Sequence, residues 1–394
     1  MGGCSGALAR GTGTGAGQGA LDVALQKGRA PAFTLTSDLR GIGVSIPVVG
    51  WRKGRDTRGE LRVAGTLGPV AQITTLNIAG GGLTARGDVA LNADGTLDRA
   101  RFAQLQIGSW LDAPVTLRGR GKGRPVGITI GSGRVDLRGA SLLGGDGQGG
   151  PLAVRLGRLQ IAQGIRLDDF RGDFASNGGF NGQFSGRLNG GPRVQGTVVP
   201  QSGRFAIRLR SDDAGGVFGA AGFVKNAVGG SVDLTLAPTG GAGTFDGVLK
   251  VEALRIRDAP AMAALLDSIS VVGLLRQLDG QGLAFDEVDA TFRLTPSAVI
   301  VTQSSAVGPG LGISLDGIYM LANKQIDFQG VISPLYVLNG IGSIFTRKGE
   351  GLIGFNFNLA GTADDPQVSV NPLSAFTPCM FRENFRRPPP QVTQ

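Results

Sequence analysis

The residues that could carry chemistry in this chain are four adjacent acidic pairs: Asp168-Asp169, Asp212-Asp213, Asp286-Glu287 and Asp364-Asp365. Two carboxylates held close together can serve as a general acid and a general base. Adjacent residues of an extended strand, however, point to opposite faces, so these pairs do not share a site. We interpret them as turn and edge-strand residues, most clearly Asp365, because the following Pro366 favours a turn.

The residues and motifs that other common catalytic centres require are absent from this sequence. The chain has no His, which excludes Ser-His-Asp and Cys-His nucleophiles and His-based metal sites. It also lacks a Gly-x-Ser-x-Gly elbow and a phosphate-binding loop. The Gly-rich stretch 11–17 follows no strand and is interpreted as a flexible or truncated start. Cys4 and Cys379 lie near opposite ends, which argues against a disulfide. We expect no enzyme activity, no cofactor and no metal.

The charge balance does not indicate a nucleic-acid-binding protein. There are 39 Lys and Arg against 30 Asp and Glu, but the Arg residues are scattered, and only two Trp and two Tyr could stack on bases. The net charge of +9 fits an anionic partner such as a lipid surface. Arg-rich codon usage of a GC-rich genome explains it equally well.

The elements that dominate the chain are strands with alternating apolar and polar residues. The clearest stretches are 311–316, 326–332 and 354–361, which predict antiparallel hairpins with one apolar face. The sequence predicts a mainly β fold: a long, twisted antiparallel sheet with an open apolar groove, bent at some of the 69 Gly residues. The candidate groove residues are Ile313, Leu315, Ile326, Phe328, Phe355, Phe357 and Leu359.

One segment has helical spacing instead. An amphipathic helix is expected over 258–278, ended by Asp279 and Gly280. Its apolar stripe consists of Met262, Leu265, Leu266, Ile269, Val272 and Leu275. This helix either covers the apolar face of the sheet, or lies on a membrane or gates the groove.

The last residues, 377–394, form a basic, Pro-rich tail with room for a short helix. Its Phe and Arg residues suit a membrane surface or a protein partner, and the alternative is a solvated end. The candidate contacts are Phe381, Arg382, Phe385, Arg386 and Arg387.

Several ordered blocks resemble the bacterial AsmA-like superfamily, in its YhdP-type branch. The blocks include 257–260 (RDAP), 306–309 (AVGP), 329–334 (QGVISP), 349–355 (GEGLIGF) and 368–374 (VSVNPLS). The chain departs from that family at 378–382 (PCMFR), where a Pro-Gly pair usually stands. The resemblance implies an inner-membrane-anchored periplasmic protein, built of repeating β-grooves, that moves phospholipid towards the outer membrane.

The expected organisation follows from these patterns. It comprises a start (1–20), a β-meander or groove region (21–257), the helix (258–280), an AsmA-like C-terminal β-region (281–376) and the tail (377–394). No run of about 18 uncharged apolar residues occurs. If the protein is periplasmic, as the resemblance implies, the usual N-terminal anchor is missing from this chain.

The expected function is therefore a non-enzymatic lipid conduit of the bacterial envelope. A one-sided apolar sheet that does not close must be covered or must leave a trough for acyl chains. The partners expected are phospholipid, a membrane surface and envelope proteins. The competing hypothesis is a structural scaffold that assembles envelope or outer-membrane proteins.

Overall fold

The chain is mainly β-structure in the computed structural model, as the sequence predicts, with 61% of the described residues in strands and 7% in helices. The structure describes residues 12–46, 51–139, 149–176, 179–224, 226–241, 243–257, 260–269, 272–334, 348–351, 353–363, 365–376, 386–388 and 390. The chain divides into two compact units, Met1–Arg187 and Leu188–Gln394, which we call unit 1 and unit 2.

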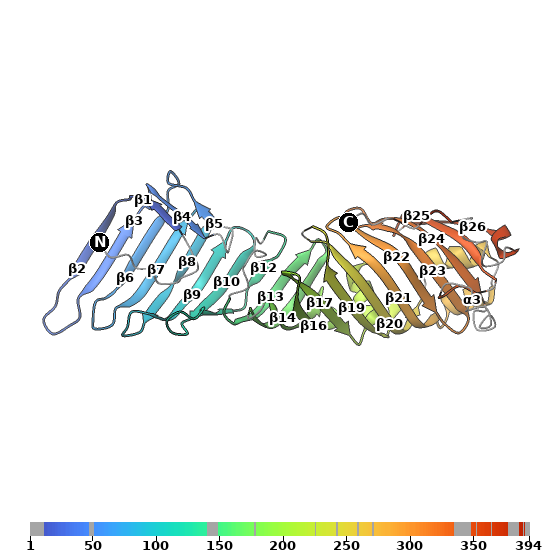
Figure 1. The fold of residues 1–394 in the computed structure, drawn as a ribbon, viewed down its shortest axis with the longest axis horizontal. Coiled ribbons are helices and arrows are strands. Elements are labelled where there is room, and N and C mark those ends of the chain that lie inside the picture. Colours follow the sequence, from blue (N-terminus) through green and yellow to red (C-terminus); the bar gives the residue numbers. More distant parts are fainter. Residues whose placement is uncertain are drawn as a thin grey trace. The chain divides into compact units, whose positions relative to one another are not determined.

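Unit 1 is a succession of hydrogen-bonded strands (Figure 1). They are β2 (Gly19–Ala24), β3 (Ala32–Ser37), β6 (Glu60–Thr66), β7 (Gln72–Gly80), β8 (Leu83–Leu91), β9 (Leu97–Ile107), β10 (Leu111–Arg118), β11 (Gly127–Ile130), β12 (Arg134–Asp136), β13 (Leu152–Ala162), β14 (Ile165–Ala175) and β15 (Asn181–Leu188). Short turns join most neighbours, and the neighbouring strands from β2 to β10 pair in antiparallel fashion.

One part of this sheet departs from the antiparallel expectation. Strands β11 and β12 lie end to end along β10, and both pair with it in antiparallel fashion. After residues 137–151, β13 runs parallel to both β11 and β12. The sheet is therefore mixed at this point, because a longer connection permits a parallel pair where a tight turn does not.

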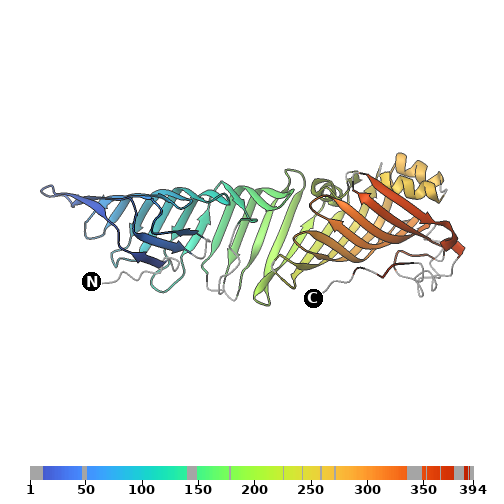
Figure 2. The same ribbon diagram turned by 90° about the horizontal axis from the view of Figure 1, so that it is seen from above.

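A small three-stranded sheet accompanies the main sheet of unit 1 (Figure 2). It consists of β1 (Thr12–Gly15), β4 (Ile42–Ile46) and β5 (Trp51–Lys53), in the order β1-β4-β5. The Trp51 indole donates a hydrogen bond of 2.9 Å to the Gly81 carbonyl in the β7–β8 turn. Strand β1 lies within the stretch expected to be a flexible start, and its pairing with β4 orders it.

Lys53 is buried beside Trp51, with 1% of its surface exposed. Its ammonium group donates to the carbonyl oxygens of Leu39 (2.7 Å), Ile42 (3.0 Å) and Gly54 (3.1 Å). A buried charge is tolerated only when its hydrogen bonds are satisfied, and three carbonyl dipoles satisfy this one.

Unit 2 is an antiparallel meander interrupted by helices. Its strands are β16 (Arg193–Gln201), β17 (Arg204–Ser211), β18 (Ala227–Val228), β19 (Ser231–Pro238), β20 (Phe245–Ile256), β21 (Leu283–Leu294), β22 (Ala298–Val307), β23 (Leu311–Met320), β24 (Gln325–Pro334), β25 (Phe355–Thr362) and β26 (Pro366–Asn371). The strand pairs described from β16 to β26 are all antiparallel.

The helix α1 (Ala214–Ala221), which the sequence pattern did not predict, follows β17. The Asp213 side chain caps its start by accepting from the Gly216 amide at 2.8 Å, and Gly222 ends it with a positive φ of 79°. Its first residue, Ala214, is fully buried in a cluster with Val232, Val251 and Leu254. The carboxylate of Asp213 is thus structural.

The expected single helix over 258–278 is two helices, α2 (Pro260–Ser268) and α3 (Val272–Asp279). The Ser268 hydroxyl donates to the Ala264 carbonyl at 2.7 Å, in the last turn of α2. The helical spacing predicted the helical content of this segment but not its division into two helices. After β26, a short 3-10 helix, η3 (Pro372–Phe376), precedes the tail.

Candidate functional site: an apolar face on each unit

The main sheet of unit 1 has one face made of apolar residues. Because directly paired residues of neighbouring strands share a face, the register can be followed from strand to strand. Two adjacent cross-strand rows run from β2 to β14 and hold only apolar residues and Gly. Row A is Leu21, Leu35, Val63, Leu76, Gly87, Phe102, Val115, Ile130, Val154 and Gly172; row B is Val23, Phe33, Gly65, Ile73, Val89, Ala100, Leu117, Ile128, Leu152 and Phe174.

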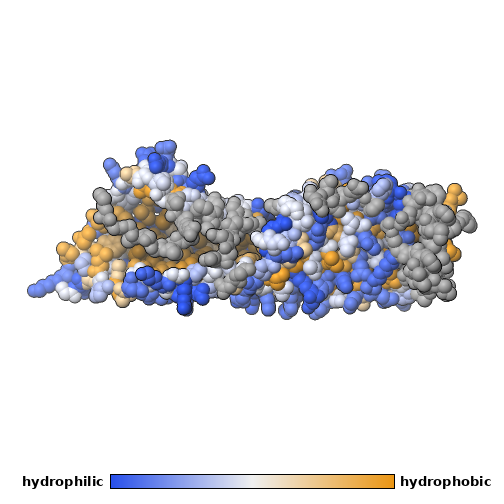
Figure 3. All heavy atoms as spheres, viewed as in Figure 1, coloured by the Kyte–Doolittle hydropathy of each residue, from blue (hydrophilic) through white to orange (hydrophobic). Residues whose placement is uncertain are grey.

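This face is accessible towards β2. Leu21 is 61% exposed and Val23 is 49% exposed. Figure 3 shows hydrophobic residues gathered on a hollowed face of unit 1, over the blue and cyan strands of Figure 1. At about 4.8 Å between strands, the rows extend over roughly 40 Å. An acyl chain occupies about half of a 30 Å hydrocarbon core, so the rows are longer than one acyl chain.

Unit 2 repeats this arrangement with its own row. The row from β16 to β26 also holds only apolar residues and Gly: Val198, Ile207, Leu236, Gly247, Phe292, Val301, Gly317, Phe328, Leu359 and Val368. The register pairs Ile313 with Ile332 and Ile332 with Phe355, and it links Leu315 to Phe357 through Gly330. The alternation therefore predicted correctly that Ile313, Leu315, Phe355, Phe357 and Leu359 share one face.

Part of the predicted groove in unit 2 is a packed core. Ile313 (6% exposed) and Phe357 (4% exposed) are buried in one cluster with Leu265, Leu266 and Leu278 of the two helices. Leu315, Phe355 and Leu359 pack against the same cluster. The expectation that Ile313 and Phe357 line an open groove is therefore wrong. The physical reason is that α2 and α3 cover this end of the apolar face.

The remaining predicted residues of this region take the following positions. Ile326 is 9% exposed, and Phe328 is half-buried in the row described above. Met262, Ile269 and Leu275 are partly buried against the helix-covered cluster. Val272 begins α3, and its side chain lies outside the described part of the structure. Of the two placements expected for the helical segment, the structure shows the one on the sheet.

The basic tail also differs from the expectation. The side chain of Arg386 is 8% exposed, and its guanidinium lies 2.6 Å from Asp316 Oδ1 and 2.7 Å from Glu350 Oε1. Arg387 pairs with Asp327 at 2.7 Å, and both of these side chains are more than half exposed. The expected membrane or partner contact is wrong for Arg386, because carboxylates of the same chain bury its charge. Phe381, Arg382 and Phe385 lie outside the described residues.

The opposite, polar faces of the sheets carry cross-strand ion pairs. Examples are Arg155 with Asp173 (3.0 Å) and Arg293 with Asp246 (2.8 Å). The hydrogen bond from Arg208 holds the pKa of Asp233 below its usual value, with a further contribution from Arg210. These pairs alternate with apolar residues along their strands, so the charged side chains lie on one face of the sheet and the apolar side chains on the other.

The adjacent acidic pairs form no acid-base centre among the described residues. Asp168 accepts from Arg166 at 2.9 Å, and Asp213 caps α1. Glu287 binds Lys348 at 2.7 Å, while its neighbour Asp286 is exposed. Asp364 lies outside the described part of the chain.

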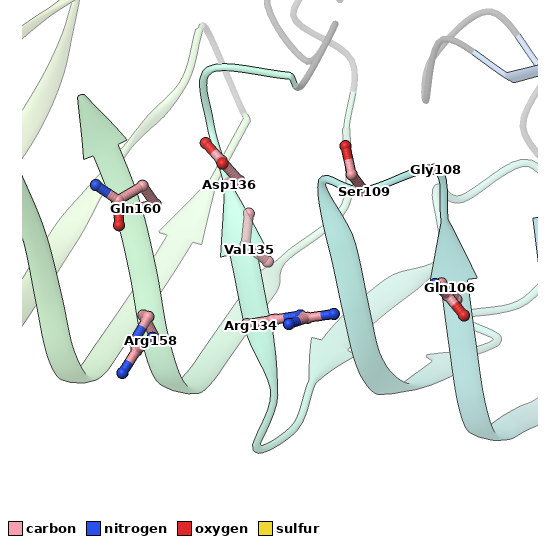
Figure 4. A pocket seen from close by; sticks show the side chains of 8 residues that line it. All are labelled: Gln106, Gly108, Ser109, Arg134, Val135, Asp136, Arg158 and Gln160. Atoms are coloured by element: carbon pink, nitrogen blue, oxygen red, sulfur yellow. The ribbon is translucent and has the colours of Figure 1, made fainter. Parts of the chain in front are cut away.

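The polar face of unit 1 holds a cavity of about 440 Å³, lined by Gln106, Gly108, Ser109, Arg134, Val135, Asp136, Arg158 and Gln160. Arg134 and Arg158 are direct cross-strand neighbours, yet Figure 4 shows their side chains turned to opposite sides. Each pairs with its own carboxylate, Asp112 at 3.5 Å and Asp168 at 3.6 Å. The polar groups therefore do not converge on a common ligand position.

The described residues contain no group of three or more His, Cys, Asp or Glu side chains placed to hold a metal ion. Among the helices within the described ranges, none is long and apolar enough to cross a membrane. Comparison with known proteins gave no match to any family model, any curated protein or any solved structure.

Proposed function

We propose that this chain binds the acyl chains of phospholipid along its apolar sheet face and serves as a non-enzymatic lipid conduit. The observation that carries the proposal is the pair of apolar rows in unit 1, uninterrupted by any polar side chain from β2 to β14. Leu21 and Val23 are exposed and most other residues of the rows are half-buried, so an apolar face of this extent has surface left for a ligand or partner to cover.

The free energy of acyl-chain binding depends on how many apolar contacts form and little on where along the rows they form. Each CH₂ group that leaves water contributes about 0.8 kcal/mol, wherever along the rows it lies. Many equivalent contacts favour movement along the face over capture at one point, and the headgroup can remain in water. Such a role needs no nucleophile, metal or proton shuttle.

The proposal also includes a location for the protein, the bacterial cell envelope. The ordered blocks at 306–309, 329–334 and 368–374 support membership of the AsmA-like superfamily. That membership would place the protein in the periplasm of a bacterial envelope, between an inner-membrane anchor and the outer membrane. Its partners would be phospholipid, a membrane surface and envelope proteins.

A specific observation in unit 2 supports a second function, that of a scaffold for envelope proteins. There the helices α2 and α3 fill one end of the apolar face with the chain's own side chains, including the fully buried Leu266 and Leu278. An apolar face that is packed against the chain's own helices needs no lipid to cover it. The solvent-facing surface of unit 2 would then be the part that contacts other proteins.

Two neighbouring residues of β7 provide the test. Leu76 lies in row A, and Asn77 points to the opposite, polar face; both are half-buried. Leu76→Asp should reduce the lipid that copurifies with the protein several-fold, because a carboxylate covered by an acyl chain is costly to desolvate. Asn77→Asp should leave bound lipid unchanged.

The readout is the molar ratio of phospholipid to protein, measured after purification without detergent, with melting curves to show that both variants fold. If the folded Leu76 variant carries as much lipid as the unmodified chain, the conduit is excluded and the scaffold takes its place. Phe357 would be a poor choice for this test, because it is 4% exposed and its substitution would disturb a core.

A further inference from the structure

The polar face of β23 and β24 is covered, unlike the polar faces that carry exposed ion pairs. Asp316 and Gln329 are direct cross-strand partners on this face, and they are only 2% and 5% exposed. Two short segments of the same chain lie over them: residues 348–351 and residues 386–388. A polar sheet face that is buried in this way needs a specific set of partners.

The first partner is the guanidinium of Arg386, held between two carboxylates. Nη2 lies 2.6 Å from Asp316 Oδ1, and Nη1 lies 2.7 Å from Glu350 Oε1. All three side chains are at least nine-tenths buried. Because the two carboxylates bind different nitrogens of one planar group, the arrangement suits Arg and not the single ammonium of Lys.

The two carboxylates are themselves oriented by neighbours. The Ser314 hydroxyl donates to Glu350 Oε1 at 2.5 Å, and the Gln329 amide donates to Asp316 Oδ2 at 2.9 Å. The Gly351 amide donates to the Ser333 hydroxyl at 2.8 Å, which fixes the segment that carries Glu350. The acceptors for the guanidinium are thus preorganised by the sheet.

The second partner is the peptide backbone of Arg387. Gln329 Nε2 donates to the Arg387 carbonyl at 2.6 Å, and Gln329 Oε1 accepts from the Arg387 amide at 2.8 Å. The side-chain amide therefore pairs with a main chain in both directions, as a neighbouring strand would. The Arg387 side chain adds an exposed pair with Asp327.

We propose that Asp316, Gln329 and Glu350 form a recognition site for an arginine-containing peptide, occupied in this structure by the chain's own residues 386–388. Without Arg386 the site would hold two buried carboxylates facing no cation, which is strongly unfavourable. The site lies on the sheet face opposite the apolar rows, so this inference is independent of the proposed lipid binding.

Adding the peptide in trans tests the site directly. In the full chain with Arg386→Ala and Arg387→Ala, the site is vacated, and a labelled peptide spanning 383–390 (ENFRRPPP) should bind as measured by fluorescence anisotropy. We expect binding at least tenfold tighter than to the unmodified chain, whose site is filled. The peptide with Lys in place of its first Arg should bind at least tenfold more weakly.

Equal affinity of the Arg and Lys peptides, or no binding to a folded double variant, would overturn the proposal. Should the double variant fail to fold, trypsin cleavage between Arg386 and Arg387 of the intact chain decides the question. Cleavage should be at least tenfold faster in Asp316→Asn than in the unmodified chain. The matched control Asp286→Asn, which neutralises an exposed carboxylate on β21, should leave the rate unchanged; equal rates in both variants would contradict the proposal.

Discussion

Phe357 of β25 and Leu266 of α2 belong to the same buried cluster, with 4% and 0% of their surfaces exposed. The helix thus closes over the sheet where the strand alternation alone would leave an apolar surface open. Leu21, at the edge of the apolar face of unit 1, is 61% exposed. The apolar sheet face is therefore covered by helices at one end of unit 2, whereas part of the corresponding face in unit 1 is accessible.

Leu266→Ala should destabilise unit 2 by about 2–5 kcal/mol, because it removes a fully buried side chain and leaves a cavity beneath α2. Denaturant unfolding followed by circular dichroism would measure the change. The neighbouring exposed residue gives the control: Asp267→Ala should change stability by less than about 0.5 kcal/mol. Equal effects of both substitutions would show that α2 does not pack on the sheet.

Gly87 should not tolerate a side chain, since a Cβ at this position would lie 2.1 Å from the Arg101 carbonyl oxygen of the paired strand. We expect Gly87→Ala to cost about 1–3 kcal/mol, because the backbone at this bulge must shift. At Gly127 the nearest atom is 3.6 Å away, so Gly127→Ala should be tolerated. Thermal melts of the two variants compare them, and similar midpoints would contradict the close approach.

Lys53→Met should destabilise the small sheet of unit 1. The substitution removes hydrogen bonds from a charged donor to three carbonyl groups, with a net contribution of about 1.5–3 kcal/mol for a bond of this kind. The exposed Lys27 serves as a control, and Lys27→Met should have little effect on unfolding by denaturant. If Lys53→Met and Lys27→Met unfold at the same denaturant concentration, the hydrogen bonds from Lys53 to the three carbonyl groups do not stabilise the fold.

The Asp233 ion pairs predict a small pH dependence. Hydrogen bonding to Arg208 lowers the pKa of Asp233 below its usual 3.8, so the folded state binds its proton less readily than the unfolded state. The stabilisation is present above pH 3.8 and is lost as the pH falls through the lowered pKa. Because the partners are partly exposed, the contribution should stay below about 1 kcal/mol.

Comparing the unmodified chain with Asp233→Asn isolates this contribution. The difference in melting temperature should be largest near neutral pH and should vanish in acid. A difference that persists unchanged below the folded pKa would mean that the ion pairs contribute nothing to the pH dependence.

Strand alternation identified the apolar faces well, because a period of two assigns each residue to a face whatever its partner. It placed Ile313, Leu315, Phe355, Phe357 and Leu359 on one face. It could not show what covers a face. The helices over Phe357 and the site around Arg386 depend on contacts between distant residues; Asp316 and Arg386 are 70 positions apart.

The lipid content of the purified chain tests the central claim most directly. The protein would be prepared without detergent, extracted with organic solvent, and its lipids identified and counted by mass spectrometry against an equal mass of an unrelated protein from the same host. The account predicts phospholipid in stoichiometric amounts, reduced in Leu76→Asp and retained in Asn77→Asp. Protein that is folded and free of phospholipid would contradict it.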